Sequence, residues 1–547
     1  MLSDPIRLEV FKNVFAAVAE EMGVVLRKSS YSPNIKERRD YSCALFDPTG
    51  KMIAQAAHIP VHLGSMPLSV LAAIEKFKIS PTADDPQATN HGFVPGDIVV
   101  LNDPYQGGTH LPDITFVSPV FTSDENKTLK LGTSEDPILL GYVASRAHHA
   151  DVGGMTPGSM PVAREIIQEG LIIPPLKLFE AGRRNRAAWD LILANVRTPE
   201  ERAGDLWAQI AANIRGGIRL QEITAKYGID QVHFFMQELL SYTESMTRHL
   251  LAKIPDGIYE FEDFLDGDGI IDKPISIAVR IMIAGDEAEV DFSESAPQQS
   301  GSVNAVYAIT LSAVYYVFRC LIGLDVPNNS GCLVPIKVIA EPGSVVNALP
   351  PAPVAGGNVE TSQRIVDVLL GALAKAVPDK IPAASQGTMN NITIGGWDPN
   401  KGRSFTYYET IGGGIGARID ADGPSGMHSH MTNTLNTPVE ALEYAYPLQV
   451  IQYGIRENSG GFGKYCGGDG LIREIESLVE SQVTLLTERR RLPPYGLSGG
   501  DPGSLGENQI IESGKEKVLR GKGTNVLKAG DRLVVKTPGG GGFGSED

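Results

Sequence analysis

The sequence has few cysteines, a deficit of basic residues and no long apolar run. Its 547 residues include four cysteines, and no two form a CxxC pair, so it offers no thiolate zinc site or thioredoxin-like motif. With 48 Lys and Arg against 65 Asp and Glu, its net charge is −17, which argues against a nucleic-acid partner. No stretch approaches the roughly 18 apolar residues of a membrane span. We therefore expect a cytoplasmic protein with buried free thiols and no membrane partner.

The motifs that commonly bind nucleotides are also missing. The chain contains neither GxxxxGK[ST] nor a strand–GxGxxG–helix unit, so we expect it to bind no ATP or dinucleotide itself. Tight turns explain the glycines at 107–108 and 412–414 better than phosphate binding does. Ser385 does not lie in a GxSxG elbow, which gives a serine hydrolase little support. The basic run Arg489-Arg490-Arg491 is most simply a solvated or salt-bridged turn.

Length and patterning predict a multi-domain α+β (mixed α/β) protein. Apolar residues recur at helical spacing over residues 4–28, and residues 198–251 are almost free of proline, so both segments predict helices. Short apolar runs predict strands at residues 98–101, 113–121 and 138–144. We also expect a hairpin at 41–55, helices at 67–78, 303–324 and 365–377, and a strand face at 277–283.

Three domains account for these patterns. We expect an N-terminal α/β domain at residues 1–255, with a metal-bearing sheet followed by long helices. A central α+β domain should follow at 256–380. Glycine becomes dense beyond that point, which indicates close backbone approach in a β-containing C-terminal domain at 381–547.

Two polar segments carry the strongest chemical signal. The first, residues 102–113, reads NDPYQGGTHLPD, and the second, residues 146–154, reads RAHHADVGG. Imidazole and carboxylate together suit a divalent metal that activates water or polarises a carbonyl. If the predicted strands pair, His110, Asp113 and His148 could lie near one end of the sheet.

Spacing alone does not decide which further residues bind the metal. His148 and His149 would face opposite ways on a strand, so at most one of them is expected to bind the ion. Asp103, Asp151 or the upstream Asp40 could supply a fourth ligand. His58 with His62, and His428 with His430, could line further pockets or a second site, although structural roles outweigh metal binding there.

Many runs, in order along the chain, carry a family resemblance. They are NIKERRDYSCALFD at 34–47, AHIPVHLGSMP at 57–67, NDPY through Asp113 at 102–113, RAHHAD at 146–151, PGSMP at 157–161, GGNVETSQR at 356–364, GTMNN at 387–391, HMTNT at 430–434 and TPGGGGFG at 537–544. Together they resemble the hydantoinase B / 5-oxoprolinase family over about residues 5–544. One departure is an insert at residues 123–137 that is longer than the resemblance leads us to expect.

The resemblance implies a division of labour between two chains. A hydantoinase A-like partner holds ATP and phosphorylates a substrate carbonyl oxygen, and the B-type chain completes the reaction. Relatives open cyclic amides such as hydantoins (including N-methylhydantoin), 5-oxoproline and lactams, or form part of acetone and acetophenone carboxylases. The metal ligands of relatives map to Asp40, His110, Asp113 and His148 here. Asp103 or His149 could then act as the catalytic base or orient a ligand.

The leading hypothesis is therefore the metal-bearing B subunit of an ATP-dependent cyclic amide hydrolase. It implies a hetero-oligomer with one divalent metal, zinc before manganese or iron, and with ATP bound by the partner only. A related hypothesis is a subunit of a carboxylase that acts on a small ketone. A third, from another class, is a non-catalytic scaffold that shapes the partner's site.

Overall fold

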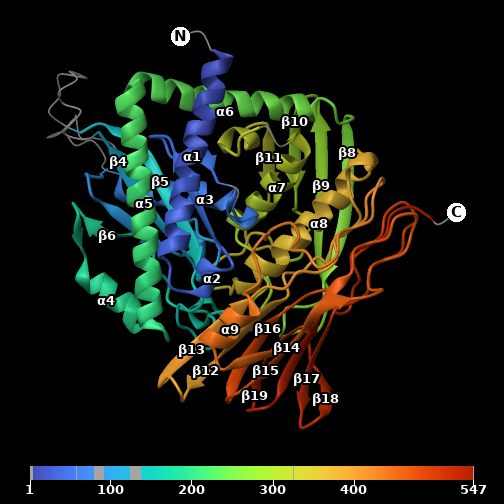
Figure 1. Ribbon diagram of the computed structural model, residues 1–547. Coiled ribbons are helices and arrows are strands. Elements are labelled where there is room, and N and C mark those ends of the chain that lie inside the picture. The colour runs from blue at the N-terminus through green and yellow to red at the C-terminus, as the bar shows by residue number, and fades with distance from the viewer. Residues whose placement is uncertain (1–3, 57, 79–91, 123–136, 324–325, 546–547) are drawn as a thin grey trace.

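The computed structural model describes residues 4–56, 58–78, 92–122, 137–323 and 326–545. Figure 1 shows helices and several β-sheets in one mixed α+β assembly, which confirms the predicted fold class. The expected insert at 123–137 lies outside the described residues except for its last one. Across the described ranges, no helix combines the length and the apolar character that crossing a bilayer requires.

A seven-stranded sheet forms the base of the N-terminal half. In spatial order its strands are β2 (Met52–Gln55), β1 (Tyr41–Phe46), β5 (Leu139–His148), β4 (Asp113–Phe121), β3 (Ile98–Leu101), β6 (Leu176–Glu180) and β7 (Arg183–Arg184). All neighbouring strands are antiparallel. The register places Asp113, the first residue of β4, opposite His148, the last residue of β5. The two strands do pair, which was the condition for bringing His110, Asp113 and His148 together, and β5 extends past residue 144 to reach His148.

Helices cover both faces of this sheet. They are α1 (Pro5–Ser29), α5 (Pro199–Tyr227) and α6 (Ile229–Leu251) on one side, and α3 (Ser65–Phe77) and α7 (Tyr307–Ile322) on the other. Alternate residues of β1 point to opposite faces. Cys43 and Leu45 pack in the cluster that includes α1, whereas Ala44 and Phe46 pack in the cluster that includes α3. Burying each large side chain stabilises the fold by roughly 1.5–3 kcal/mol.

The first helix follows its local sequence signals. Asp4 accepts a hydrogen bond from the amide of Ile6 at 3.0 Å, and Pro5 occupies the first turn, where its missing N–H costs nothing. The helix predicted at 4–28 is thereby confirmed. Helix α3 begins at Ser65, two residues before the predicted start, because Pro67 is tolerated within a first turn.

A second sheet lies in the centre of the chain. Its order is β11 (Ile336–Ile339), β10 (Glu287–Asp291), β9 (Ile275–Ala284) and β8 (Gly257–Leu265), and α8 (Ser362–Leu373) packs against β8 and β9. Ile277, Val279 and Ile281 of β9 are buried as predicted. A π-helical turn, Gly357–Thr361, leads directly into α8.

Two sheets make up the C-terminal part, at the bottom of Figure 1. One has the order β13 (Arg403–Glu409), β12 (Asn391–Asp398), β16 (Ser481–Leu486) and β19 (Lys522–Leu527). The other has the order β14 (Leu448–Arg456), β15 (Gly470–Ser477), β20 (Arg532–Lys536), β17 (Glu507–Glu512) and β18 (Lys515–Val518). The short helices α2 (Pro33–Lys36), α4 (Arg186–Ala194) and α9 (Val439–Ala445) complete the α-helices of the described ranges.

The glycine-rich tail shows the predicted close approach of backbones. A methyl group on Gly540 would lie 2.1 Å from the carbonyl oxygen of Ile415, a distance that no side chain tolerates. One hydrophobic cluster includes residues from Ile59 to Leu486 and so draws on all three predicted domains, whose boundaries stay a prediction.

The expectation of buried free thiols is half right. All four cysteines are free, but only Cys43 and Cys332 are buried, while Cys320 and Cys466 are exposed.

Candidate metal centre

The polar segment after β3 folds into a compact loop that delivers two of the predicted ligands. Asp103 caps a 3-10 turn, Pro104–Gln106, and Gly107 follows with φ of 88°. A methyl group on Gly107 would lie 2.5 Å from the carbonyl oxygen of Leu68, so this position requires glycine. The chain then turns at His110, whose carbonyl accepts a hydrogen bond from the amide of Asp113 at 3.1 Å.

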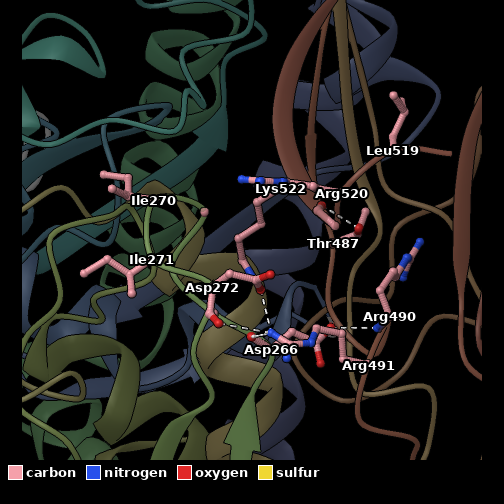
Figure 2. Close-up of a pocket in the computed structure, with 13 residues that line it drawn as sticks. Asp266, Ile270, Ile271, Asp272, Thr487, Arg490, Arg491, Leu519, Arg520 and Lys522 are labelled. Atoms are coloured by element: carbon pink, nitrogen blue, oxygen red, sulfur yellow. Dashed lines mark hydrogen bonds and ion pairs between the residues drawn. The ribbon is translucent and has the colours of Figure 1, made fainter. Parts of the chain in front are cut away.

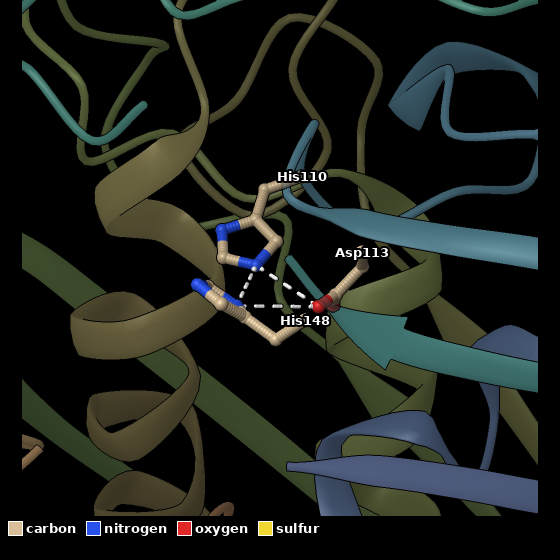
Figure 3. Close-up of side chains that lie close together, drawn as sticks. All are labelled: His110, Asp113 and His148. Carbon is tan, nitrogen blue, oxygen red and sulfur yellow. Dashed lines mark hydrogen bonds and ion pairs between the residues drawn. The ribbon is translucent and has the colours of Figure 1, made fainter. Parts of the chain in front are cut away.

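His110, Asp113 and His148 converge on one point, as Figure 3 shows. Nε2 of His110 lies 3.2 Å from Nδ1 of His148. Oδ1 of Asp113 lies 3.3 Å from the first nitrogen and 3.4 Å from the second. His110 and Asp113 are 0% exposed and His148 is 2% exposed, so all three side chains are buried inside the protein.

This spacing fits a divalent cation. An ion about 2.05 Å from each of three tetrahedral ligands would hold their atoms about 3.3 Å apart. The carboxylate oxygen Oδ1 of Asp113 makes no hydrogen bond of good geometry with any described residue, although it is fully buried. A buried acceptor beside two imidazole nitrogens calls for a positive charge between them. Two histidines and one carboxylate suit zinc, manganese or iron.

The second carboxylate oxygen of Asp113, Oδ2, is oriented by contacts with Thr109 and His62. Oδ2 accepts a hydrogen bond from Thr109 Oγ1 at 2.6 Å and lies 3.3 Å from Nε2 of His62, whose Nδ1 is 2.8 Å from Ser42 Oγ. Burial opposes ionisation of Asp113, but the neighbouring imidazoles of His110, His62 and His148 outweigh it and hold its pKa well below the usual value. Asp113 is therefore an anion oriented for a cation.

Tyr408 of β13 fixes the ring of His148. The two rings stack with centroids 4.2 Å apart and planes inclined by 13°. The Tyr408 hydroxyl donates to Asn391 Oδ1 at 2.9 Å, and Asn391 Nδ2 in turn donates to Glu360 Oε1 at 2.9 Å. Burial also lowers the pKa of His148, which keeps the imidazole neutral and able to donate a lone pair.

Asp40 lies beside the triad but outside the group of converging atoms. Its carbonyl oxygen accepts the amide of His148 at 3.0 Å, while its carboxylate is 3.8 Å from Nη1 of Arg38. Burial raises the pKa of Asp40, although the nearby charges of His148 and Arg38 oppose that shift. Its predicted role as a metal ligand stays a prediction.

The two predicted catalytic residues are not joined to the triad. The carboxylate of Asp103 accepts the amide of Tyr105 at 3.0 Å and the side chain of Gln106 at 2.6 Å, which is a capping arrangement. Nε2 of His149 lies 2.9 Å from Oε1 of Gln209 on α5, on the face of the sheet opposite to His148. The expectation that the two histidines face opposite ways is thus confirmed.

Asp151, His58 and His430, which were also considered from the sequence, make contacts elsewhere in the fold. Asp151 pairs with Arg197 at 2.9 Å. His58 Nδ1 accepts the amide of Cys43 at 3.2 Å. Nε2 of His430 lies 3.8 Å from Asp367 Oδ1, and neither His430 nor His428 joins a metal-type group among the described residues.

Arg490 and Arg491 of the basic run line a separate pocket of about 190 Å³, drawn in Figure 2. The amide of Arg490 donates to Asp266 at 2.7 Å, and Arg491 pairs with Asp272 at 2.5 Å. Arg489 is buried and pairs with Asp263 and Asp367, each at 2.7 Å. The predicted salt-bridged turn is confirmed, and no triad residue lines this pocket.

Several neighbours of the triad escaped sequence reasoning. Asn358, on the π-helical turn, has its Nδ2 3.1 Å from Nε2 of His110. Tyr408 and Glu360 also come from the second half of the chain. The run at 356–364 contributed to the family resemblance, and that was the only available signal for Asn358 and Glu360.

The fold and the site together define a mixed α+β protein with a buried candidate centre for a divalent metal. The chain belongs to the hydantoinase B/oxoprolinase family, whose model matches residues 4–546. The resemblance inferred from the ordered runs is therefore confirmed.

Relatives match the chain over its whole length. An uncharacterized protein of Methanocaldococcus jannaschii is 42% identical over 99% of this chain and 91% of its own. 5-oxoprolinase 1 of Arabidopsis thaliana is 39% identical over 100% of this chain and 42% of its own. A Pseudomonas sp. protein named as the B-type component of a D-/L-hydantoinase is 32% identical over 99% of this chain and 90% of its own. The chain thus spans about two-fifths of the length of the 5-oxoprolinases it matches.

Two solved structures share the fold. The ATP-dependent caprolactamase from Pseudomonas jessenii superposes with a TM-score of 0.89 at 28% identity, covering 100% of this chain and 92% of that one. A nucleotide-free acetone carboxylase superposes with a TM-score of 0.88 at 19% identity, covering 99% and 76%, which is a likeness of fold alone.

Proposed function

We propose that this chain is the metal-bearing B subunit of an ATP-dependent hydrolase of cyclic amides such as hydantoins, 5-oxoproline or lactams. The observation that carries the proposal is the buried group of His110, Asp113 and His148. Relatives named 5-oxoprolinase, D-/L-hydantoinase and caprolactamase support a cyclic amide as the substrate. The chain has no common nucleotide motif, which supports a separate hydantoinase A-like partner that binds ATP.

The chemistry divides naturally between two chains. An amide carbonyl is a poor electrophile, and phosphorylation of its oxygen by the partner would create a good leaving group. A divalent ion held by the triad would supply Lewis acidity, which lowers the pKa of water or polarises a carbonyl. Thr109 and His62 orient the carboxylate of Asp113 for this task, and Tyr408 fixes the ring of His148.

Burial of the centre is consistent with this role. The triad is at most 2% exposed, so bulk water does not reach it freely. A phosphorylated amide is reactive, and a closed site protects such a substrate from uncontrolled hydrolysis.

The test requires the chain with and without its partner. The chain alone should not hydrolyse ATP, whereas the complex should open the ring and form ADP. His110→Ala should slow ring opening at least about 1,000-fold, because the substitution removes a ligand of the ion on which this step depends. His249→Ala is the matched control, because His249 is exposed near the end of α6 and should leave ring opening unchanged.

Three outcomes would contradict the proposal. ATP hydrolysis by the chain alone would show that this chain, and not a partner, carries out the ATP-dependent step. A strict requirement for bicarbonate would favour the ketone carboxylase. Full activity of His110→Ala, or a purified complex without bound metal, would favour a scaffold that only shapes the partner's site.

A further inference from the structure

A basic pocket lies apart from the triad, between the loop that follows β8 and the C-terminal sheets (Figure 2). Four of the side chains that line it are basic and two are acidic, namely Arg490, Arg491, Arg520, Lys522, Asp266 and Asp272. The whole chain has a net charge of −17, so this excess of cations is a local departure from its composition. A concave wall with an excess of one charge attracts small ions of the opposite sign.

The guanidinium group of Arg490 has no counterion among the described residues. Its Nη1 donates to Oδ1 of Asn390 at 2.7 Å and to the carbonyl oxygen of Glu488 at 2.6 Å. Its Nη2 donates to Oδ1 of Asn508 at 2.8 Å, and its Nε is buried without a described acceptor. All three acceptors are neutral oxygens. Burial lowers the pKa of Arg490 to about 10, so the nearby carboxylates do not fully compensate its charge.

The two lining carboxylates already have partners. Asp266 accepts hydrogen bonds from the backbone amides of Arg490 at 2.7 Å and Leu492 at 3.2 Å. Asp272 pairs with the side chain of Arg491 at 2.5 Å. Neither carboxylate forms an ion pair with the guanidinium of Arg490, and so the lining keeps an uncompensated positive charge.

Arg520 is the second lining cation without a counterion. Its side chain is exposed and forms no ion pair or hydrogen bond within the described ranges. Lys522 differs, because it is buried and pairs with Glu488. Two unpaired guanidinium groups, those of Arg490 and Arg520, thus line one cavity. The planar fork of a guanidinium matches the paired oxygens of a carboxylate or a phosphate.

The size of the pocket and its apolar side chains restrict the ligand. Pockets for drug-sized ligands have roughly 300–1,000 Å³. A cavity of about 190 Å³ therefore suits a small ion and is too small for a nucleotide. Ile270, Ile271 and Leu519 add an apolar wall that accommodates a short hydrocarbon tail. We propose that this pocket binds a small oxyanion, either inorganic phosphate or the carboxylate of a short organic acid.

The proposed hydrolase reaction would supply both kinds of anion. Hydrolysis of a phosphorylated cyclic amide yields inorganic phosphate and an opened chain whose new carboxylate derives from the former carbonyl. The anion site itself does not depend on that reaction, because no triad residue lines the pocket. The two proposals can therefore be tested separately.

Anion titration of the metal-free chain tests the assignment. The protein is first treated with a chelator, so that phosphate cannot bind to a metal ion. Inorganic phosphate and propionate are then titrated separately by calorimetry at low ionic strength. At least one of them should bind at a single site with a dissociation constant of about 1 mM or lower, and sodium chloride should weaken that binding. His110→Ala should bind the anion as wild type does, because His110 belongs to the triad.

Variants of the two unpaired arginines locate the bound anion. Arg520→Ala should weaken binding at least about 5-fold, and Arg520→Glu should abolish it. Arg490→Lys keeps the charge but loses the planar fork, so it should also weaken binding. Arg183→Ala is the matched control, since Arg183 is an exposed arginine of β7 and its loss changes the net charge equally. That variant should bind within about twofold of wild type. Thermal unfolding verifies that each variant folds.

The outcomes are distinct. Binding of phosphate alone, or of propionate alone, would support the site and identify its ligand. No saturable binding of either anion up to about 20 mM would overturn the proposal. Equal affinities for wild type and Arg520→Glu would overturn it as well, and loss of binding in His110→Ala would assign the anion to the triad instead. Failure of metal binding or of ring opening would refute the proposed function and leave the anion site standing.

Discussion

Replacing Asp113 by asparagine should destroy metal binding while leaving the fold intact. An asparagine keeps the shape of the side chain and can still accept the hydrogen bond that Thr109 donates at 2.6 Å. Its amide nitrogen would then face the ring nitrogens of His110 and His148, now 3.3 and 3.4 Å from Oδ1 of Asp113. The new donor would bond one of these lone pairs and occupy the place of the ion.

The expected magnitude follows from what is lost. The substitution removes the only anion among the three converging groups and blocks a neutral ligand as well. We expect affinity for Zn²⁺ or Mn²⁺ to fall more than 100-fold, which corresponds to about 2.8 kcal/mol. The metal-free variant should unfold at or above the temperature of the metal-free wild type, because a buried charge has been neutralised and its neighbours keep hydrogen bonds.

Calorimetric titration and thermal unfolding with and without metal measure both effects. The matched control is Asp97→Asn, since Asp97 is another buried carboxylate, directly before β3 of the same sheet, and pairs with Lys177 at 2.7 Å. That variant should lose stability, because it leaves a buried ammonium without its partner, but should keep its metal affinity. Metal binding by Asp113→Asn within tenfold of wild type would refute the reasoning.

Three further results are expected. His62→Ala should weaken metal binding about 10- to 100-fold in a titration, because it removes a group that orients the triad aspartate; unchanged affinity would count against that role. Burial lowers the pKa of both His428 and His430 to about 4, so the unfolded chain, with ordinary values near 6.5, takes up protons first. Stability should therefore fall as pH drops from about 6.5 toward 4, and a constant unfolding temperature across that range would be contrary evidence. Gly540→Ala should lower the unfolding temperature by several degrees, whereas Gly523→Ala, with open space around it, should have little effect in the same assay.

The heart of the site could be predicted because it depends on local order. His110 and Asp113 are three residues apart, and His148 follows on the next strand, so pairing of β4 with β5 was enough to bring them together. The catalytic role expected for Asp103 stays a prediction, but its local contacts have a structural explanation. An aspartate before proline favours a cap, and the carboxylate serves the 3-10 turn that follows it.

The triad neighbours that come from distant parts of the chain could not be predicted from the sequence. Asn358 and Tyr408 arrive through the packing of the central and C-terminal regions, which no periodicity or spacing encodes. Asp40 was one of several possible fourth ligands, and the family resemblance selected it. The structure places it near His148 without joining it to the converging atoms. His149 is also a histidine, but its side chain lies on the opposite face of the sheet from that of His148, where it contacts Gln209 of α5.

The pairing of Asp113 with His148 makes the centre a reporter of strand alignment. If β5 slipped by one residue against β4, His149 would take the place of His148 and every side chain of β5 would exchange faces. The site would then lack one imidazole ligand or hold it in the wrong orientation. Metal uptake during refolding should therefore appear only in molecules that have adopted the native alignment, and a bound ion would penalise every slipped arrangement.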